Sequence, residues 1–215
     1  MTAQAGGASH PSQAAIAAQR SALRMHMRRL RRALPRTEQL RASASVAKQL
    51  LRLPLLRPGA RVGIYLALPG ELNLQPFIER AWARGCRLFV PHITHVRRRQ
   101  MAFYRFTSSS RLQSRQWGIS QISDIHRQRC IDTELLDVVL VPTVAFDRRG
   151  NRLGMGAGFY DRHFARLGRT GAWRRPQLIG IAYACQEVAA LDAQRHDVTL
   201  ESIATERGII RRRRG

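Results

Sequence analysis

The clearest structural signal in the chain is the segment LLDVVLVPTVAFDRRGNRLGMGAGFYDR, which spans residues 135–162. Its first part, LLDVVLV at 135–141, is the most apolar stretch of the sequence and predicts a buried central strand. Glycines then stand at positions 154, 156 and 158, and a helical pattern over 158–167 follows directly. A strand, a glycine-rich loop and the start of a helix, in this order, indicate an α/β protein with a ligand at the loop.

The glycine-rich loop has the composition of a phosphate-binding cradle. Small residues allow backbone N–H groups to approach phosphate oxygens, and the N-terminus of the following helix favours negative charge. Arg152 precedes the loop and is a candidate for a forked contact to phosphate, whereas Asp161 follows the loop as a candidate magnesium ligand. The spacing differs from GxxxxGK[ST] and from GxGxxG. From these residues alone, a nucleotide site of another type, a sugar-phosphate site and a tight turn without ligand all remain open.

The rest of the sequence alternates between short apolar runs and amphipathic segments. Residues 61–68 and 87–91 are predicted strands, and 75–84 between them is a predicted helix, as a parallel crossover requires. The other expected elements are helices over 14–34 and 37–51 and strands over 101–106, 177–184 and 203–210, the last at a sheet edge. The expected fold class is therefore α/β, as a single three-layer α/β/α sandwich with a mostly parallel central sheet.

The chain has 215 residues, which is enough for one domain with a sizeable core. We expect a disordered leader over residues 1–19, an α/β domain over 20–210 and a basic tail over 211–215. No apolar run approaches the roughly 20 residues that cross a bilayer, so we expect no membrane association. The sparse cysteines form no CxxC pair, which fits a reducing cytoplasm better than a disulfide framework or a zinc site.

The composition is strongly basic, with 37 basic and 14 acidic side chains and a formal net charge of +23. Such a charge suggests a polyanionic partner, either nucleic acid or a phosphorylated ligand. The arginines are spread from Arg20 to Arg214, and we find no RNA-binding signature or aromatic platform. Most of the charge is therefore interpreted as a solvated basic surface. An RNA- or nucleotide-binding protein without catalysis stays an alternative.

The run FDRRGNRLGMGAGFYDR at 146–162 resembles the signature of the 5-formyltetrahydrofolate cyclo-ligase family, also called 5,10-methenyltetrahydrofolate synthetases, which is roughly FDxxGxRLGxGxGxYDR. Four further segments agree with the family in order and approximate spacing. They are RSALR at 20–24, YLALPGELN at 65–73, LLDVVLVP at 135–142, and IAYACQ with HDV between 181 and 198. The resemblance covers roughly residues 19–205.

The resemblance implies an ATP- and Mg²⁺-dependent ligase of one-carbon folate metabolism. The family cyclises 5-formyltetrahydrofolate to 5,10-methenyltetrahydrofolate and releases ADP and phosphate, through phosphorylation of the formyl oxygen and attack by N10. Such chemistry depends mostly on positioning and on neutralisation of charge. The implied partners are ATP, Mg²⁺ and 5-formyltetrahydrofolate, with no specific nucleic acid, in a cytoplasmic monomer. A sugar-phosphate isomerase on a similar fold, which would work without ATP, is a further alternative.

The resemblance also assigns roles to individual positions. The implied ATP-binding residues are Arg20, Arg24, Arg152, Leu153, Gly154, Met155, Gly156, Ala157, Gly158, Phe159 and Tyr160, of which Arg152 and Tyr160 are implied to be catalytic. The implied folate-binding residues are Leu66, Glu71, Trp117, Met155 and Phe159. Asp161 and Asp197 match the two magnesium-associated acids of the family, although 36 residues separate them.

A few positions depart from the family pattern. Met155 and Ala157 stand where some members have arginine and lysine, and Leu74 stands where threonine is common. Gln121 and Ile122 replace a Glu-Pro pair. The resemblance therefore implies weaker phosphate contacts at 155 and 157, and it does not carry over a folate or loop hydrogen bond at 74 or an adenine or ribose contact at 121–122.

Overall fold

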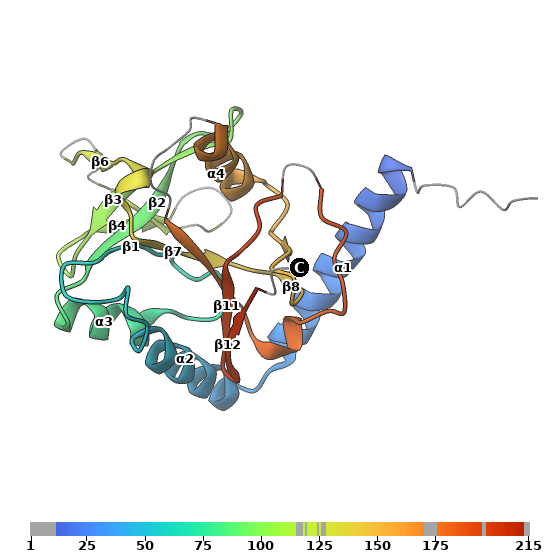
Figure 1. Cartoon of the computed structure of the whole chain (residues 1–215), viewed down its shortest axis with the longest axis horizontal. Helices are drawn as coiled ribbons and strands as arrows, with labels where there is room; N and C mark the ends of the chain where they lie inside the picture. Colours follow the sequence, from blue (N-terminus) through green and yellow to red (C-terminus); the bar gives the residue numbers. More distant parts are fainter. Residues whose placement is uncertain are drawn as a thin grey trace, which may run out of the picture.

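The computed structural model describes residues 12–114, 118, 120–123, 125, 128–169, 176–194 and 197–212. At its centre is an eight-stranded sheet with the strand order β12-β11-β10-β7-β1-β2-β3-β6 (Figure 1). The inner strands run parallel: β11 (Ser202–Thr205), β10 (Gln177–Ile181), β7 (Val138–Pro142), β1 (Arg61–Gly63) and β2 (Arg87–His95). The outer strands pair antiparallel: β12 (Gly208–Arg211), β3 (Gln100–Phe106) and β6 (Cys130–Ile131). The predicted α/β fold with a mostly parallel sheet is confirmed.

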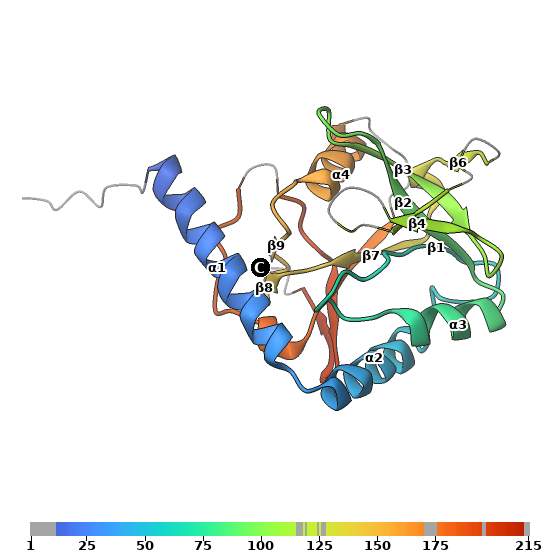
Figure 2. The same ribbon diagram turned by 180° about the vertical axis from the view of Figure 1, so that it is seen from behind.

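Helices lie on both sides of this sheet. The helices α2 (Arg36–Leu50) and α3 (Gln75–Ala83) cover one face, and α4 (Phe159–Arg169) lies against the other face near β3 (Figures 1 and 2). The long helix α1 (Gln13–Ala33) runs along one side of the molecule. It contacts β8 (Ala145–Phe146), which forms a two-stranded ribbon with β9 (Arg152–Leu153). A second such ribbon joins β4 (Leu112–Ser114) to β5 (Ser120–Ile122).

The burial pattern explains why these segments form these elements. Residues 138–141 of β7 are at most 1% exposed, as expected for a central strand covered on both faces. In α2, Ala42, Val46 and Leu50 recur at every fourth position and pack as one apolar stripe in the core below the sheet. Burial of each large apolar side chain contributes about 1.5–3 kcal/mol. The parallel centre of the sheet is therefore the most rigid support available to a site.

Several of the sequence-based element boundaries differ from the structure. The strand expected over 61–68 leaves the sheet after Gly63, although the Ile64 N–H still donates to the Phe89 carbonyl at 2.8 Å. The edge strand expected over 203–210 is a hairpin, because a turn at 206–207 separates β11 from β12. Helix α1 begins at Gln13, inside the segment assigned to the leader. Among the described residues, no helix combines the length and the apolar character that a membrane crossing requires.

Candidate active site

A small hairpin, absent from the sequence-based expectation, holds the glycine-rich loop. Its two strands, β8 and β9, pair antiparallel immediately after β7, and Asp147 organises the turn between them. The buried Asp147 carboxylate accepts hydrogen bonds from the N–H groups of Arg149 (2.9 Å), Asn151 (3.0 Å) and Leu191 (3.0 Å). The hairpin therefore fixes Arg152 and the loop after it at the carboxyl end of the central strand.

The loop at 154–158 bends through backbone angles that favour glycine. Gly156 has a φ of +104° and Gly158 a φ of +68°. A Cβ added at Gly156 would lie 3.6 Å from the guanidinium carbon of Arg24, and one added at Gly158 would lie 3.3 Å from Nη1 of Arg99. Arginine side chains thus flank the bare backbone of the loop at two of its glycines.

An apolar cavity of about 370 Å³ opens on one side of the loop. Its wall contains residues that follow β1, residues in the second half of β2, and Pro142 at the end of β7. The chain passes from β1 to its neighbour β2 on one side and later returns to β7 on the other, so this is the switch point at which parallel sheets bind ligands. The lining residues that the sequence predicted are Leu66, Glu71, Arg152, Gly154, Met155, Ala157, Gly158, Phe159, Tyr160 and Asp161.

Glu71 supplies a carboxylate to this largely apolar cavity. Its Oε2 accepts a hydrogen bond from the Leu68 N–H at 3.0 Å, and desolvation raises the pKa of the Glu71 carboxyl. Burial also raises the pKa of Tyr160, so its hydroxyl stays protonated and able to donate at neutral pH. The cavity therefore offers a half-buried acceptor and a half-buried donor between apolar walls, an arrangement suited to a flat ligand with polar edges.

A second cavity of about 370 Å³, which we call the arginine pocket, lies on the other side of the loop. Four arginines and two aspartates are among its lining residues: Arg20, Arg24, Arg99, Arg162, Asp161 and Asp197. Because cations outnumber carboxylates and three loop glycines expose their backbone, the pocket suits a polyanion. Gly154, Gly158 and Asp161 line both cavities, so the two spaces share one wall.

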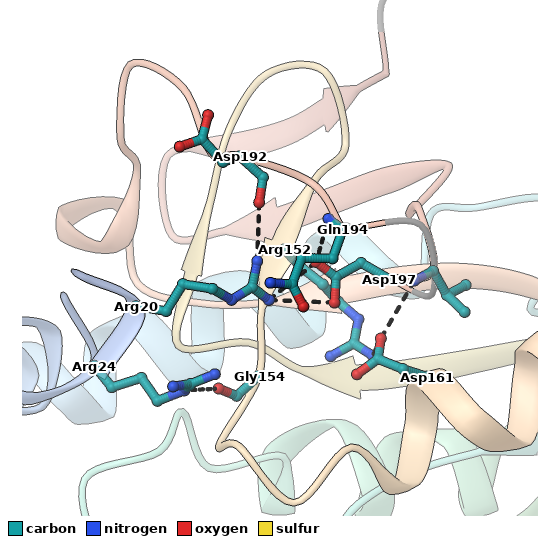
Figure 3. Close-up of polar contacts among 9 residues, drawn as sticks. Arg20, Arg24, Arg152, Gly154, Asp161, Asp192, Gln194 and Asp197 are labelled. Atoms are coloured by element: carbon teal, nitrogen blue, oxygen red, sulfur yellow. Dashed lines mark hydrogen bonds and ion pairs between the residues drawn. The ribbon is translucent and has the colours of Figure 1, made fainter. Parts of the chain in front are cut away.

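Each of the two aspartates of the arginine pocket forms an ion pair with an arginine (Figure 3). The Arg152 Nη2 lies 2.6 Å from Oδ1 of Asp161, and the Arg152 side chain is only 3% exposed. The Arg20 Nη2 lies 2.9 Å from Oδ2 of Asp197, whose second hydrogen bond comes from the Gln194 N–H at 3.0 Å. The N–H of Val198 also approaches Oδ1 of Asp161 at 3.3 Å, so the two aspartates lie on neighbouring parts of one wall. The fold thus brings together two acids that are far apart in the sequence.

Helix α1 contributes a stripe of arginines to both cavities. The Arg24 Nε donates to the Gly154 carbonyl at 2.9 Å, and burial, with Arg20 and Arg28 nearby, lowers the pKa of Arg24. One turn later, Arg28 lines the apolar cavity and contacts the Met155 sulfur at 3.7 Å. The spacing of four residues places these arginines on one helix face, so a single helix contacts the first residues of the loop, at 154–156.

The structure brings together most of the site residues expected from the sequence. Leu153 differs, because its side chain is fully buried in the small core beneath the loop with Met27 and Val144. Trp117 lies outside the described residues. The sequence reasoning missed several lining residues, namely Arg28, Tyr65, Arg99, Arg162 and Gln194. For Arg28 a signal existed, because it continues the four-residue spacing of Arg20 and Arg24.

The fold and the two cavities define an α/β protein in which an arginine-lined pocket and an apolar cavity share one wall. The model of the 5-formyltetrahydrofolate cyclo-ligase family matches residues 16–206, and the chain therefore belongs to this family.

Individual relatives support the same assignment over nearly the whole chain. The 5-formyltetrahydrofolate cyclo-ligase of Haemophilus influenzae is 30% identical over 186 residues, which is 86% of this chain and 96% of that protein. The Escherichia coli (strain K12) cyclo-ligase is 30% identical over 181 residues, 83% of this chain and 96% of its own length. The NMR structure of Aquifex aeolicus 5,10-methenyltetrahydrofolate synthetase has a TM-score of 0.76 at 28% identity, covering 91% of this chain and 94% of that one.

Proposed function

We propose that this chain catalyses the ATP- and Mg²⁺-dependent cyclisation of 5-formyltetrahydrofolate to 5,10-methenyltetrahydrofolate, with release of ADP and phosphate. Membership of the cyclo-ligase family supports the reaction class. The observation that carries the proposal in this molecule is the shared wall between the apolar cavity and the arginine pocket. A transfer between two bound molecules needs their reacting groups side by side, and this wall separates them by one layer of loop backbone.

The apolar cavity is the proposed folate site. A reduced pterin presents several N–H groups along one edge, and the Glu71 carboxylate is placed to accept hydrogen bonds from them. Leu66, Met155 and Phe159 would enclose the ring faces, and Trp117 joins this proposed set on the family resemblance. Met155 is partly exposed at the opening of the cavity, which leaves room for the part of the substrate beyond the pterin ring.

The arginine pocket is the proposed ATP site. Arg20, Arg24 and the backbone amides at 154–158 would bind the triphosphate, since forked guanidinium donors and exposed amides match phosphate oxygens. Phe159 and Tyr160, at the start of α4, continue this segment as proposed nucleotide contacts. At present Arg20 is paired with Asp197, so triphosphate binding would give it a new anionic partner.

The two aspartates of the arginine pocket fit a magnesium ion that arrives with ATP. Among the described residues, no group of three or more His, Cys, Asp or Glu side chains could hold a metal. Magnesium, however, commonly takes one or two carboxylates and completes its shell with phosphate oxygens and water. Asp161 and Asp197 are therefore the proposed ligands. The bound ion would neutralise phosphate charge, and the arginines released from the two aspartates would do the same.

In the proposed reaction the formyl oxygen attacks the γ-phosphorus of ATP, and the bond to the β,γ-bridging oxygen breaks with its electron pair leaving on ADP. The N10 nitrogen then attacks the activated formyl carbon and loses its proton. Inorganic phosphate leaves from that carbon with its C–O electron pair, which completes the methenyl bridge. Arg152 lines the folate cavity next to the shared wall, where it can stabilise the transferred phosphoryl group. The Tyr160 hydroxyl is placed to donate a hydrogen bond to the same oxygens.

The test is a spectrophotometric assay of the purified chain with 5-formyltetrahydrofolate and MgATP, in which the methenyl product absorbs. We expect product only when ATP and Mg²⁺ are both present. Product without ATP would support the isomerase-like alternative, and tight, salt-sensitive binding of RNA without turnover would support the RNA-binding alternative. Absence of product from folded protein at micromolar concentration would refute the proposal.

We further propose that the enzyme acts as a monomer in the cytoplasm. The residues proposed for both substrates line two adjacent cavities of one chain. The proposed compartment rests on the sparse cysteines of the sequence, which form no CxxC pair.

A further inference from the structure

The hairpin between β2 and β3 carries an arginine in an unusual backbone conformation. The tip of this hairpin contains Arg97, Arg98 and Arg99 in succession, and all three side chains are exposed. Arg99 has a φ of +50° and is the one non-glycine residue with a positive φ in the described part of the chain. Its N–H donates to the Val96 carbonyl at 3.0 Å and closes a tight turn. A side chain with a Cβ disfavours this left-handed region, which is often occupied at functional sites.

The side chain of Arg99 reaches the glycine-rich loop. Its Nη1 lies 3.3 Å from the position that a Cβ on Gly158 would take, and Arg99 lines the arginine pocket. The hairpin rises beside α4 in both views of the fold, and β3 contacts α4 (Figures 1 and 2). Arg97 and Arg98, from the same tip, do not line either cavity. The hairpin thus delivers one of its three arginines to the site.

The location of Arg99 differs from that of the other pocket arginines. Arg24 covers the loop at Gly156, which lines only the arginine pocket, whereas Arg99 covers it at Gly158, which lines both cavities. The guanidinium of Arg99 also forms no ion pair with a described carboxylate, in contrast to Arg20 and Arg152. The Arg99 guanidinium is therefore a positive charge at the shared wall without an ion-pair partner among the described carboxylates. Such a charge can bind an anion that passes between the cavities.

We propose that Arg99 is a phosphate-binding residue that contacts the terminal phosphoryl group of ATP during its transfer to the folate. This inference rests on the proposed function and adds a residue from the β2–β3 hairpin to the site. In the proposed transfer the phosphoryl group crosses the shared wall, to which Gly158 contributes, and negative charge on its oxygens is stabilised there. Arg24 and Arg99 would then hold the triphosphate from two sides of the loop.

The decisive variant is Arg99→Gly, because glycine adopts the left-handed conformation freely and removes the arginine side chain without straining the turn. We expect the kcat for MgATP-dependent cyclisation to fall about 100-fold, with the KM for 5-formyltetrahydrofolate unchanged within about twofold and with unchanged or higher thermal stability. Arg99→Lys should recover part of the loss, since lysine keeps the charge without the fork. Arg97→Ala is the matched control from the same hairpin and should behave as wild type.

A binding measurement distinguishes this role from a merely structural one. ATP should raise the melting temperature of the wild type more than that of Arg99→Gly, whereas ADP, which lacks the terminal phosphate, should stabilise both equally. Wild-type kcat and wild-type ATP stabilisation in Arg99→Gly would overturn the assignment. If the wild type binds ATP but shows no turnover, the proposed reaction fails while the melting comparison still decides the role of Arg99. If the wild type neither turns over nor binds ATP, both proposals fall.

Discussion

The two cavities on either side of the glycine-rich loop are similar in volume and opposite in chemistry. The apolar cavity is built on the ends of parallel strands and presents Glu71 between apolar walls. The arginine pocket is built from a helix, a loop and a hairpin tip, and presents paired and unpaired charges. A flat heterocycle is recognised by enclosure and a few hydrogen bonds, whereas a triphosphate is recognised by many charge-assisted contacts. Because the two binding sites share one wall, the sheet can hold the heterocycle and the long side chains can hold the triphosphate for the same reaction.

The largest effect is expected where the two cavities meet. Arg152→Ala should lower kcat by about 10²- to 10³-fold, because the guanidinium stabilises charge on the transferred group and leaves Asp161 unpaired when it is lost. Steady-state kinetics and a thermal melt of the same sample separate catalysis from stability. Arg148→Ala, which removes an exposed pair with Glu187, is the control and should change neither. Equal activity in the two variants would contradict a role for the shared wall.

The second test perturbs only the apolar cavity. Glu71→Gln should raise the KM for 5-formyltetrahydrofolate about 10- to 100-fold, since hydrogen bonds to a charged acceptor contribute about 1.5–3 kcal/mol. The KM for ATP should stay within about twofold, because Glu71 does not line the arginine pocket. Glu79→Gln, an exposed glutamate of α3, serves as control. If both substrates lost affinity equally, the division of labour between the cavities would be wrong.

The third test perturbs only the arginine pocket. Asp197→Asn should raise the Mg²⁺ concentration needed for half-maximal activity by about tenfold, because one of two carboxylate ligands is lost. Folate affinity, measured by fluorescence without ATP, should not change. Asp192→Asn is a close control, since Arg20 contacts only the backbone carbonyl of Asp192. An unchanged magnesium requirement in Asp197→Asn would remove this residue from the metal site.

A smaller effect is expected from pH. Burial raises the pKa of Glu71, so its carboxyl takes up a proton at a higher pH than an exposed glutamate with a pKa near 4.3. Protonation removes an acceptor, and the KM for 5-formyltetrahydrofolate should therefore rise several-fold as pH falls from about 8 to about 5. The same series in Glu71→Gln should be flat, because glutamine does not titrate. A matching rise in that variant would assign the pH dependence to another group.

The sequence predicted the sheet better than the surroundings of the site. The crossover from β1 through α3 to β2 follows from local apolar patterns and Pro-Gly boundaries, which need no knowledge of tertiary contacts. The β8–β9 hairpin escaped prediction because its strands are two residues long and depend on Asp147, whose partners include the distant Leu191. Short strands stabilised by long-range contacts carry almost no local signal.

The site residues likewise divide into those that local sequence predicts and those whose role depends on long-range contacts. The glycine-rich loop and Arg152 are recognisable as a phosphate cradle from local composition. The meeting of Asp161 with Asp197 follows only from family resemblance, because their proximity is produced by the sheet order. Arg99 has neighbours of identical type, and only its backbone conformation distinguishes it. Of the many arginines that produce the net charge of +23, only the few that line the two cavities have a proposed role in binding.

The central claim is that a phosphoryl group passes directly across the wall at Gly158 from ATP to the formyl oxygen of the folate. The most direct measurement uses 5-formyltetrahydrofolate with ¹⁸O in the formyl group and follows the label by mass spectrometry of the released phosphate. Direct transfer predicts that each inorganic phosphate carries one ¹⁸O atom from the formyl group. Unlabelled phosphate, with the ¹⁸O recovered in water, would contradict the account.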